Sequence, residues 1–357
     1  MKYVDEFKDK NVVAEISRKI SGLNVSANLM EVCGTHTMAL FRHGIRGLLP
    51  RNIKLLSGPG CPVCVTSEAD IDAMIGLCDV PDVIITTFGD MMKVPGSKGS
   101  LLEKRADGVD IRVVYSPLDA LKIASEERSR PVIFLGVGFE TTAPTVAATI
   151  IDAREKGLSN FYVYSAHKLI PPAIRALLNA DDVRIDGFLL PGHVSVIIGS
   201  DAYDFILKDY GVPAVVAGFE PVDILSAIYG VLKHGKVENK YSRVVSKKGN
   251  IKAQKVMNEV FEVADADWRG FGVIKNSGLE IKKKYLRFNA KEKFEIRRPS
   301  GKKRKSSCIC GEVLRGIKIP TDCRMFAKSC SPEKPKGPCM VSTEGACAAY
   351  YKYGRTK

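Results

Sequence analysis

Two cysteines in Cys-x-x-Cys spacing, Cys61 and Cys64, have the clearest chemical potential in this chain. An apolar, strand-like segment, Ile53–Ser57, runs into a Gly-Pro-Gly turn just before them, and a helix capped by Thr66 or Ser67 follows. Because the amino end of a helix favours a thiolate, we interpret the pair as a dithiol/disulfide couple. Half of a structural zinc site is the alternative, but the sequence contains no second Cys-x-x-Cys to complete it.

A third thiol, Cys33, is followed three residues later by His36. Thiolate is a soft ligand and imidazole suits iron, so this pair could hold an iron fragment. Alternatively, Cys33 is a nucleophile and His36 is its base. A buried cysteine beside a hydrogen-bonded histidine, without any chemistry, is the third interpretation, since free cysteine is among the most buried residue types.

The carboxyl-terminal region is dense in proline and glycine and indicates a bound metal. A domain this small needs a cross-link to be stable, and four thiolates bound to zinc or to an iron–sulfur cluster would provide one. The nearby dithiol favours the cluster, because only a redox-active metal could supply it with electrons. Cys308 and Cys310 lie just upstream as alternative ligands or auxiliary thiols. The four expected ligands, separated by six, eight and seven residues, are Cys323, Cys330, Cys339 and Cys347.

Strand-like and helical segments alternate through the middle of the chain, which predicts an α/β fold with parallel sheets covered on both faces. We expect two doubly wound domains, at 50–125 and 130–235, joined at Glu127–Arg130. An amphipathic helix should lie near 5–20, and the region beyond 240 should form a small third domain. The expected strands are Asp82–Phe88, Ile111–Tyr115, Val132–Leu135, Phe161–Tyr164, Gly187–Leu190 and Ala214–Ala217, and the expected helices lie near 118–126, 142–155, 171–180, 201–209 and 221–232.

Three ionisable side chains follow the ends of expected strands. They are Glu140, His167 and His193, each in a turn rich in glycine, proline or small polar residues. In open parallel sheets, ligands bind in the crevice beyond the carboxyl ends of the strands. These residues are therefore candidates for lining a cleft.

The composition bounds the function. A chain of 357 residues is long enough for two or three domains. No run of eighteen apolar residues occurs, and the charged opening Met1–Lys8 does not resemble a signal peptide. We therefore expect a cytoplasmic protein that does not enter the membrane. In that reducing compartment, ten cysteines favour metal binding or redox chemistry over disulfides.

Most of the net charge of +14 comes from one segment, 282–305, which has twelve basic and two acidic residues. Such a stretch could bind nucleic acid. However, Tyr285, Phe288 and Phe294 are spaced like packing residues, and no nucleic-acid-binding motif is recognisable. We favour a solvated face and a loop over nucleic-acid binding.

Five motifs together resemble the HypD family of [NiFe]-hydrogenase maturation proteins, and they extend over nearly the whole chain. Their order along the chain matches that of the family. The motifs are Glu31–Met38 (EVCGTHTM), Gly58–Cys64 (GPGCPVC), Gly138–Pro144 (GFETTAP), Pro191–Val194 (PGHV) and Val341–Tyr350 (VSTEGACAAY).

The resemblance implies a scaffold with redox support rather than a conventional turnover enzyme. Family members work with a small partner, HypC, and the two together form the scaffold on which an iron atom acquires two cyanides and one carbon monoxide. Cyanide comes from HypE, which carries a thiocyanate made with HypF, and the Fe(CN)2CO cargo passes through HypC to the hydrogenase large subunit. The family fold joins 1–49 to 240–357 as a mostly α-helical iron–sulfur domain beside two α/β domains.

Residue by residue, the resemblance makes Cys33 the iron ligand with His36 beside it. Cys61 and Cys64 become the redox dithiol, and the tail cysteines become ligands of a [4Fe-4S] cluster. Glu344 belongs to the last motif and is a further catalytic candidate. Two other functions remain open: a cluster-fed thiol–disulfide oxidoreductase acting on a protein partner, and an iron–sulfur protein that binds RNA through the basic segment.

Overall fold

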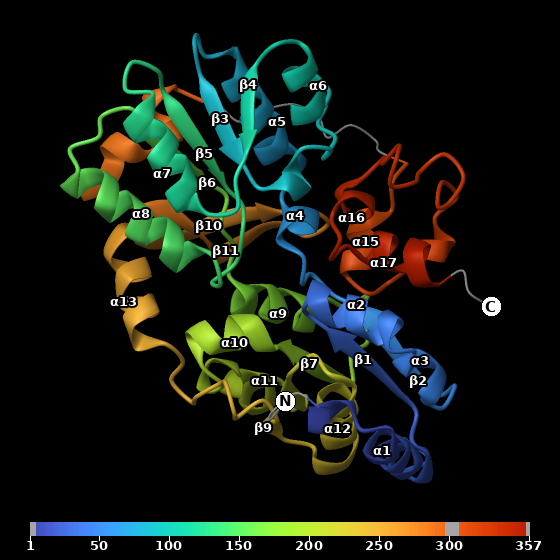
Figure 1. Cartoon of the computed structure of the whole chain (residues 1–357). Helices are drawn as coiled ribbons and strands as arrows, with labels where there is room; N and C mark the ends of the chain where they lie inside the picture. Colours follow the sequence, from blue (N-terminus) through green and yellow to red (C-terminus); the bar gives the residue numbers. More distant parts are fainter. Residues whose placement is uncertain (1–4, 297–306, 355–357) are drawn as a thin grey trace.

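Two parallel β-sheets organise the chain in the computed structural model, which describes residues 5–296 and 307–354 (Figure 1). One sheet has five strands in the order β2-β1-β7-β8-β9, and the other has four in the order β4-β3-β5-β6. β10 and β11 form an antiparallel hairpin. The strands are β1 Ala27–Glu31, β2 Ile53–Ser57, β3 Ile84–Thr87, β4 Asp110–Val113, β5 Val132–Gly136, β6 Phe161–Ser165, β7 Gly187–Pro191, β8 Ala214–Ala217, β9 Val237–Asn239, β10 Phe261–Trp268 and β11 Gly272–Ile281.

Helices cover both faces of each sheet, which confirms the doubly wound α/β class. α1 and α12 pack against one face of the five-stranded sheet, and α7 and α8 pack against one face of the four-stranded sheet. The helices are α1 Lys10–Gly22, α2 Gly34–Arg42, α3 Ile45–Leu48, α4 Pro62–Val65, α5 Glu68–Gly76, α6 Leu101–Ala106, α7 Pro117–Glu126, α8 Ala143–Glu155, α9 Ile170–Leu178, α10 Gly192–Ile198, α11 Asp204–Tyr210, α12 Pro221–His234, α13 Ile251–Val260, α14 Ala290–Lys293, α15 Cys310–Leu314, α16 Pro338–Val341 and α17 Ala346–Tyr353.

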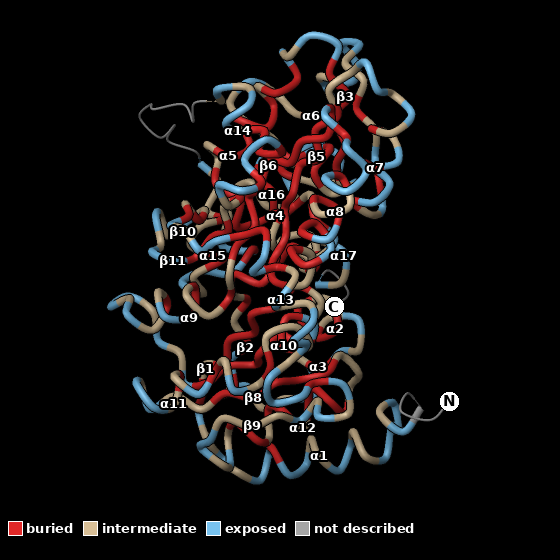
Figure 2. Tube along the Cα trace, turned by 90° about the vertical axis from the view of Figure 1, so that its left-hand side faces the viewer, coloured by how far each residue is buried: buried red, intermediate tan, exposed pale blue. Residues whose placement is uncertain are grey.

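Strands such as β5 are apolar along their whole length because each one contributes side chains to two hydrophobic cores. Along β5, Val132 and Phe134 belong to the core under α7 and α8. Ile133 and Leu135 point to the opposite face and join a second core that extends into the five-stranded sheet. Figure 2 accordingly shows buried residues along the strands and through the region between the two sheets. Successive side chains of a strand alternate in direction, so both must be apolar when both faces are covered.

The strands are shared between the sheets differently from the expected units 50–125 and 130–235. β5 and β6 pair with β3 and β4, whereas β7 and β8 join β1 and β2. The chain therefore begins in one sheet, builds the whole of the other, and returns. Local sequence patterns identify buried strands but not their partners, because any two such strands can pair in parallel.

The expected third domain, 1–49 with 240–357, is also divided differently. α13 and the β10–β11 hairpin contribute to the core under α7 and α8, so much of 251–288 packs with the four-stranded sheet. α1 packs against α12, so most of 1–49 belongs to the five-stranded sheet, although α2 contacts α17 of the tail. The carboxyl-terminal helices α15, α16 and α17 form the small helical region, and it lies beside α4 (Figure 1). Among the described residues, no helix combines the length and apolar character needed to cross a bilayer.

A thiol-rich candidate metal and redox site

The carboxyl ends of two neighbouring strands bring together the first two motif residues. Cys33 follows β1 and His193 follows β7, and these strands are adjacent in the five-stranded sheet. From β1 the chain continues to β2 on one side, while β7 lies on the other, so the strand order reverses between β1 and β7. This is the place in an open α/β sheet where a ligand-binding crevice is expected.

A cavity of about 440 Å³ lies at this point. Loops from both sheets and from the tail contribute to it, so it is an interdomain site. Much of its wall is apolar, with one thiol, one imidazole and one carboxylate exposed to it. Its lining comprises Val32, Cys33, Thr35, Gly60, Pro62, Phe139, Thr141, Thr142, Pro191, His193, Val194, Val196, Ile197 and Glu344.

Cys33 is held at the start of α2, where it is the residue preceding the first helical turn. Its backbone N–H donates to Glu31 Oε2 at 3.2 Å, and the Thr37 hydroxyl donates to the other oxygen of the same buried carboxylate. Burial raises the pKa of the Cys33 thiol to about 12, and nearby Glu344 acts in the same direction. The thiol is therefore protonated at neutral pH.

His36 is fully buried on the first turn of α2. Its Nε2 lies 2.9 Å from the carbonyl oxygen of Gly218, while Nδ1 has no hydrogen-bond partner among the described residues. Burial lowers the pKa of this imidazole to about 4, so the ring is neutral and retains a lone pair. Phe219 stacks on His193 at 4.1 Å and contacts His36 at 4.9 Å between ring centroids.

Glu344 reaches the site from the opposite end of the chain. The Thr35 hydroxyl donates to Glu344 Oε1 at 2.6 Å. Gly34 allows this approach, because a Cβ atom there would lie 2.4 Å from the Glu344 Cβ. The structure therefore brings the first and last sequence motifs together at the cavity that contains Cys33.

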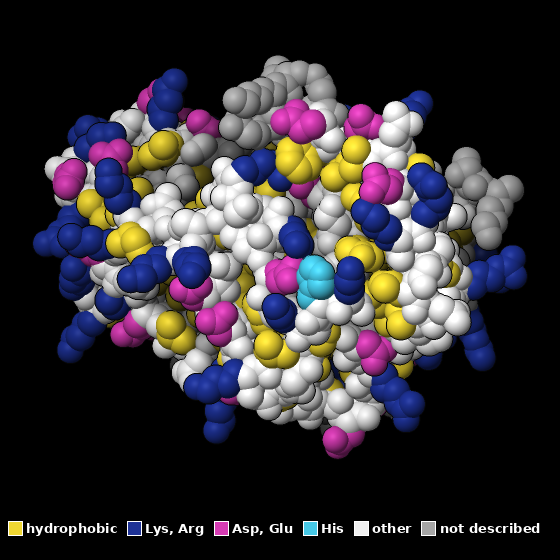
Figure 3. Space-filling view, turned by 90° about the horizontal axis from the view of Figure 1, so that it is seen from below, with side chains coloured by type: hydrophobic (Ala, Val, Ile, Leu, Met, Phe, Trp, Pro, Cys, Tyr) yellow, Lys and Arg dark blue, Asp and Glu magenta, His cyan; other side chains and the backbone are white. Residues whose placement is uncertain are grey.

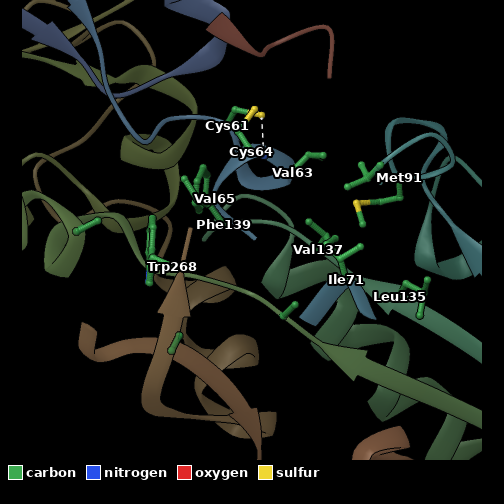
Figure 4. Close-up of a cluster of buried hydrophobic side chains, with 14 of the residues drawn as sticks. Cys61, Val63, Cys64, Val65, Ile71, Met91, Leu135, Val137, Phe139 and Trp268 are labelled. Carbon is green, nitrogen blue, oxygen red and sulfur yellow. Dashed lines mark hydrogen bonds between the residues drawn. The ribbon is translucent and has the colours of Figure 1, made fainter. Parts of the chain in front are cut away.

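The Cys61–Cys64 pair packs directly behind the Cys33 turn. Cys61 caps α4, with the Cys64 N–H donating to its Sγ at 3.3 Å, and both thiols are buried (Figure 4). Gly34 N–H donates to the Gly60 carbonyl, and a Cβ on Gly60 would lie 2.1 Å from the Cys33 nitrogen. The expected position of the dithiol between a strand and a helix start is confirmed.

Behind the dithiol, thiols continue in a row towards the tail. Cys64 hydrogen-bonds with Cys339, and burial is the first cause of the raised pKa of the Cys64 thiol. The Sγ atoms of Cys339 and Cys310 lie 2.7 Å apart. Cys310 in turn hydrogen-bonds with Cys308. A continuous series of sulfur atoms therefore leads from the Cys33 turn to the tail.

The row ends at a second cavity, which all four expected tail ligands line together with Cys308 and Cys310. The pKa of Cys347 is raised by burial and then by the facing thiols Cys308, Cys330 and Cys323. Cys339 interacts first with Cys310 and Cys64, and then with Cys347. Among the described residues, no three His, Cys, Asp or Glu side chains converge on a point that could hold a single metal ion.

Only His193 of the three strand-end candidates lines the first cavity. Glu140 is buried behind it, with Oε1 accepting from Ile170 N–H at 2.9 Å. His167 is buried against the hairpin, and its Nδ1 lies 3.1 Å from the Ser165 hydroxyl oxygen. A cavity lies at the strand ends as expected, but Glu140 and His167 do not line it.

Sequence reasoning missed Glu31 and Phe219. Glu31 lies inside the first motif, and its position at the end of a buried strand could have identified it. Burial raises the pKa of the Glu31 carboxyl to about 8, although the hydrogen bonds that the carboxylate accepts lower it. Phe219 follows β8, and only the packing of three strand ends reveals that it contacts both imidazoles.

The described part of the basic segment, residues 282–296, gives no sign of a nucleic-acid-binding surface. Tyr285 and Phe288 are buried, as expected from their spacing. Residues 297–305, including Lys302–Lys305, lie outside the described residues. On the face drawn in Figure 3, Lys and Arg side chains are scattered with Asp and Glu among them.

The buried Glu140 carboxyl predicts a pH-dependent stability difference. Burial raises its pKa from 4.5 to about 7, and its Oε2 has no partner among the described residues. Because the folded-state pKa is raised, the stabilising contribution is complete below pH 4.5 and is lost as pH rises through 7. With about 1.4 kcal/mol per pKa unit, Glu140→Gln should stabilise the fold by about 3 kcal/mol at pH 8 and by much less at pH 4.

Chemical denaturation of both proteins from pH 4 to pH 8 measures this difference. Glu155→Gln, which changes an exposed carboxylate on α8, is the control and should show no such trend. A Glu140→Gln difference that stays constant with pH would mean that the native carboxyl ionises normally.

Fold and site together define an α/β protein in which a row of buried thiols connects an interdomain cavity with a cysteine-lined tail. Comparison with known proteins specifies this class further. The model of the HypD family, described as the hydrogenase formation hypA family, matches residues 8–354. The chain belongs to this family.

The relatives match over nearly their whole length. Hydrogenase maturation factor HypD2 of Bradyrhizobium diazoefficiens is 44% identical, covering 99% of this chain and 97% of that protein. Hydrogenase maturation factor HypD of Escherichia coli is 45% identical, and the match covers 99% of this chain and 98% of the E. coli protein. A putative hydrogenase expression/formation protein of Methanocaldococcus jannaschii is 46% identical, and the match covers 96% of this chain and 95% of that protein.

Proposed function

We propose that this chain is a hydrogenase maturation factor on which, together with a HypC-type partner, the Fe(CN)2CO group is assembled. The observation that carries the proposal is the position of Cys33. Its thiol lines an interdomain cavity at the strand-order reversal, with Glu344 and His193 in the same wall and a dithiol packed behind it. The family membership supports the same role.

The side chains around Cys33 suit iron as cargo. A thiolate is a soft ligand for iron that carries strong-field diatomic ligands. Binding releases the proton that burial keeps on the thiol. The neutral His36 ring retains a lone pair on Nδ1 as a second donor near the same helix start. Phe139 and Val194 give this cavity apolar walls, which suit diatomic ligands better than polar ones would.

The Cys61–Cys64 dithiol supplies what the release of cyanide requires. Cleaving the S–C bond of a thiocyanate into a thiol and hydrogen cyanide takes up two electrons and two protons. Oxidation of two thiols to one disulfide provides two electrons and two protons. In this proposal HypE delivers the thiocyanate, which is made with HypF, and HypC passes the finished group to the hydrogenase large subunit in the cytoplasm.

The tail suits a [4Fe-4S] cluster, since six cysteines line one cavity and thiolates are the donors that such clusters use. We assign Cys308, Cys323, Cys330 and Cys347 as its ligands, because Cys308 and Cys323 act on both Cys330 and Cys347 across the cavity. Cys339 and Cys310 then form a separate pair that continues the row to Cys64. The cluster supplies one-electron redox chemistry when bound.

Infrared spectroscopy tests the proposal. The chain is produced anaerobically with a HypC-type partner, HypE and HypF, and the two-protein complex is isolated. We expect stretching bands of metal-bound cyanide and carbon monoxide, together with tightly bound iron. An iron-loaded complex that shows neither band under these conditions would refute the scaffold function.

The alternative, a reductase of protein disulfides, fits the burial of the dithiol less well. Cys61 is 3% exposed and Cys64 is fully buried, whereas an attacking thiol must reach its target sulfur. Rapid reduction of a model protein disulfide by the isolated chain would favour this alternative. RNA binding has no support from the described residues of the basic segment.

A further inference from the structure

The turn that follows β8, Gly218–Phe219, contacts both His36 and His193. The Gly218 carbonyl oxygen lies 2.9 Å from Nε2 of His36. A carbonyl can only accept, so Nε2 carries the ring proton and the lone pair remains on Nδ1. The Phe219 ring stacks on His193 with 4.1 Å between ring centroids. The position of this turn therefore sets the tautomer of one imidazole and the orientation of the other.

A buried ion pair that lies outside all five sequence motifs packs against this turn. Arg243 donates two hydrogen bonds to Asp223, from Nη1 to Oδ1 and from Nη2 to Oδ2, and each is 2.7 Å long. The Asp223 side chain is only 1% exposed. A carboxylate buried to this degree requires a charged partner, and two parallel hydrogen bonds fix its plane.

Asp223 contacts the turn at two points. A Cβ atom on Gly218 would lie 2.3 Å from Asp223 Oδ2, so glycine allows the backbone to pass this close to the carboxylate. The same oxygen accepts a hydrogen bond from Glu220 N–H at 3.3 Å, at the start of α12. The carboxylate therefore holds the turn at Gly218 and again two residues later.

Aromatic rings connect the guanidinium group with the imidazoles. The guanidinium carbon of Arg243 lies 3.7 Å from the ring centroid of Phe7 and 4.6 Å from that of Tyr241. Tyr241 in turn meets Phe219 edge-on, with 6.0 Å between ring centroids. A Cβ atom on Gly218 would also lie 2.8 Å from a Tyr241 ring carbon. An unbroken set of contacts thus leads from the ion pair to the turn.

We propose that the Asp223–Arg243 ion pair is a positioning device for iron binding. It fixes the Gly218–Phe219 turn, and through the turn it fixes the His36 tautomer and the plane of the His193 ring. This role rests on the proposed scaffold function. A histidine that binds a metal commonly donates its other N–H to a backbone carbonyl, which sets its tautomer and orientation. Here the ion pair holds the peptide group that supplies the carbonyl, and neither of its residues lines the cavity.

Two variants test the proposal. Asp223→Asn combined with Arg243→Met removes both charges, so no buried charge is left unpaired and the protein should fold. Arg243→Lys keeps the positive charge but loses the pair of parallel hydrogen bonds. The control combines Arg175→Met with Asp209→Asn. It removes another arginine that donates to an aspartate at 2.8 Å and lies over a phenylalanine ring, and neither residue lines the cavity.

¹⁵N NMR of the full-length chain with labelled histidine and without iron cargo reports the tautomer directly, and spectra of His36→Gln and His193→Gln assign the two rings. Wild-type His36 should show only the Nε2–H tautomer, with a slowly exchanging ring proton. In the double variant this exchange should be at least about tenfold faster, because the turn opens locally more often. Arg243→Lys should lie between the double variant and the wild type. The ring-current shift of His193 should decrease in the same order, and the control should match the wild type.

Iron retention by the complex with a HypC-type partner is the second measurement. The double variant should retain about tenfold less iron than the wild type, which is the lower end of the loss expected when a group that orients a metal ligand is removed. The control should retain as much iron as the wild type.

An unchanged His36 tautomer and exchange rate in both variants would overturn the positioning role. Equal acceleration in the control would show a general loosening of the fold instead, and faster exchange with full iron retention would show that iron does not depend on this imidazole. A wild-type complex without cyanide and carbon monoxide bands would refute the proposed function, whereas the NMR result would still show whether the ion pair fixes the turn.

Discussion

Replacing Cys33 by alanine is expected to abolish the cyanide and carbon monoxide bands of the partner complex while the protein still folds. The thiol is the only sulfur on the cavity wall among the described residues. Removing a group that merely supports a metal ligand already costs about 10–100-fold in affinity, so removing the soft anchor itself should exceed about 100-fold. Cys33→Ser should behave similarly, because a hydroxyl is a poor substitute for thiolate.

Cys78→Ala is the matched control for this experiment. Cys78 is also buried, and burial raises its pKa to about 11, but it packs in the core after α5 and does not line the cavity. The control should keep both bands, and circular dichroism should confirm that both variants are folded. Undiminished bands in Cys33→Ala would show that iron is anchored elsewhere, with His36 the next residue to test.

Local pattern was sufficient for the strands and helices of the middle of the chain and for the position of the dithiol, but not for α13 and the β10–β11 hairpin. β5, β6, β7 and β8 lie where continuous apolar segments predicted them, because each strand is covered on both faces. Ser67 caps α5 through its bond from the Asp70 N–H, as its sequence context indicates. These features depend on residues within a few positions of one another.

Features that depend on distant partners were not predictable in the same way. The pairing of β1 with β7 joins segments about 160 residues apart, and it creates the strand-order reversal that places Cys33 beside His193. Its hydrogen-bond geometry is that of any parallel pair, so no local signal marks it. The contacts of Cys339 with Cys64 and Cys310 likewise require the tail to fold against α4.

The two cavities are connected by the row of neighbouring cysteines that runs between them. Gly60 allows the dithiol turn to contact Cys33, and Gly34 allows Glu344 to reach the same turn, since a Cβ atom at either position would overlap its neighbour. These glycines therefore allow both the dithiol turn and the tail to pack against the Cys33 turn. Their role follows from close approach rather than from an unusual backbone angle, because neither has a positive φ.

The assignment of cluster ligands gives the second large expected effect. Cys308→Ser should remove most of the iron and acid-labile sulfide from the anaerobically purified chain, whereas Cys339→Ser should retain both. The reason is that Cys308, Cys330 and Cys323 all act on Cys347 across the tail cavity, whereas Cys339 interacts first with Cys310 and Cys64 and only then with Cys347. Sequence spacing alone had placed Cys339 among the ligands instead.

Iron and sulfide analysis per chain decides between these two ligand sets. Because both substitutions replace one sulfur by oxygen in the same cavity, each serves as the steric control for the other. Cys339→Ser should instead prevent disulfide formation at Cys310 and leave the iron content unchanged. Loss of iron in Cys339→Ser with full retention in Cys308→Ser would restore the spacing-based set, and zinc in place of iron and sulfide would refute the cluster altogether.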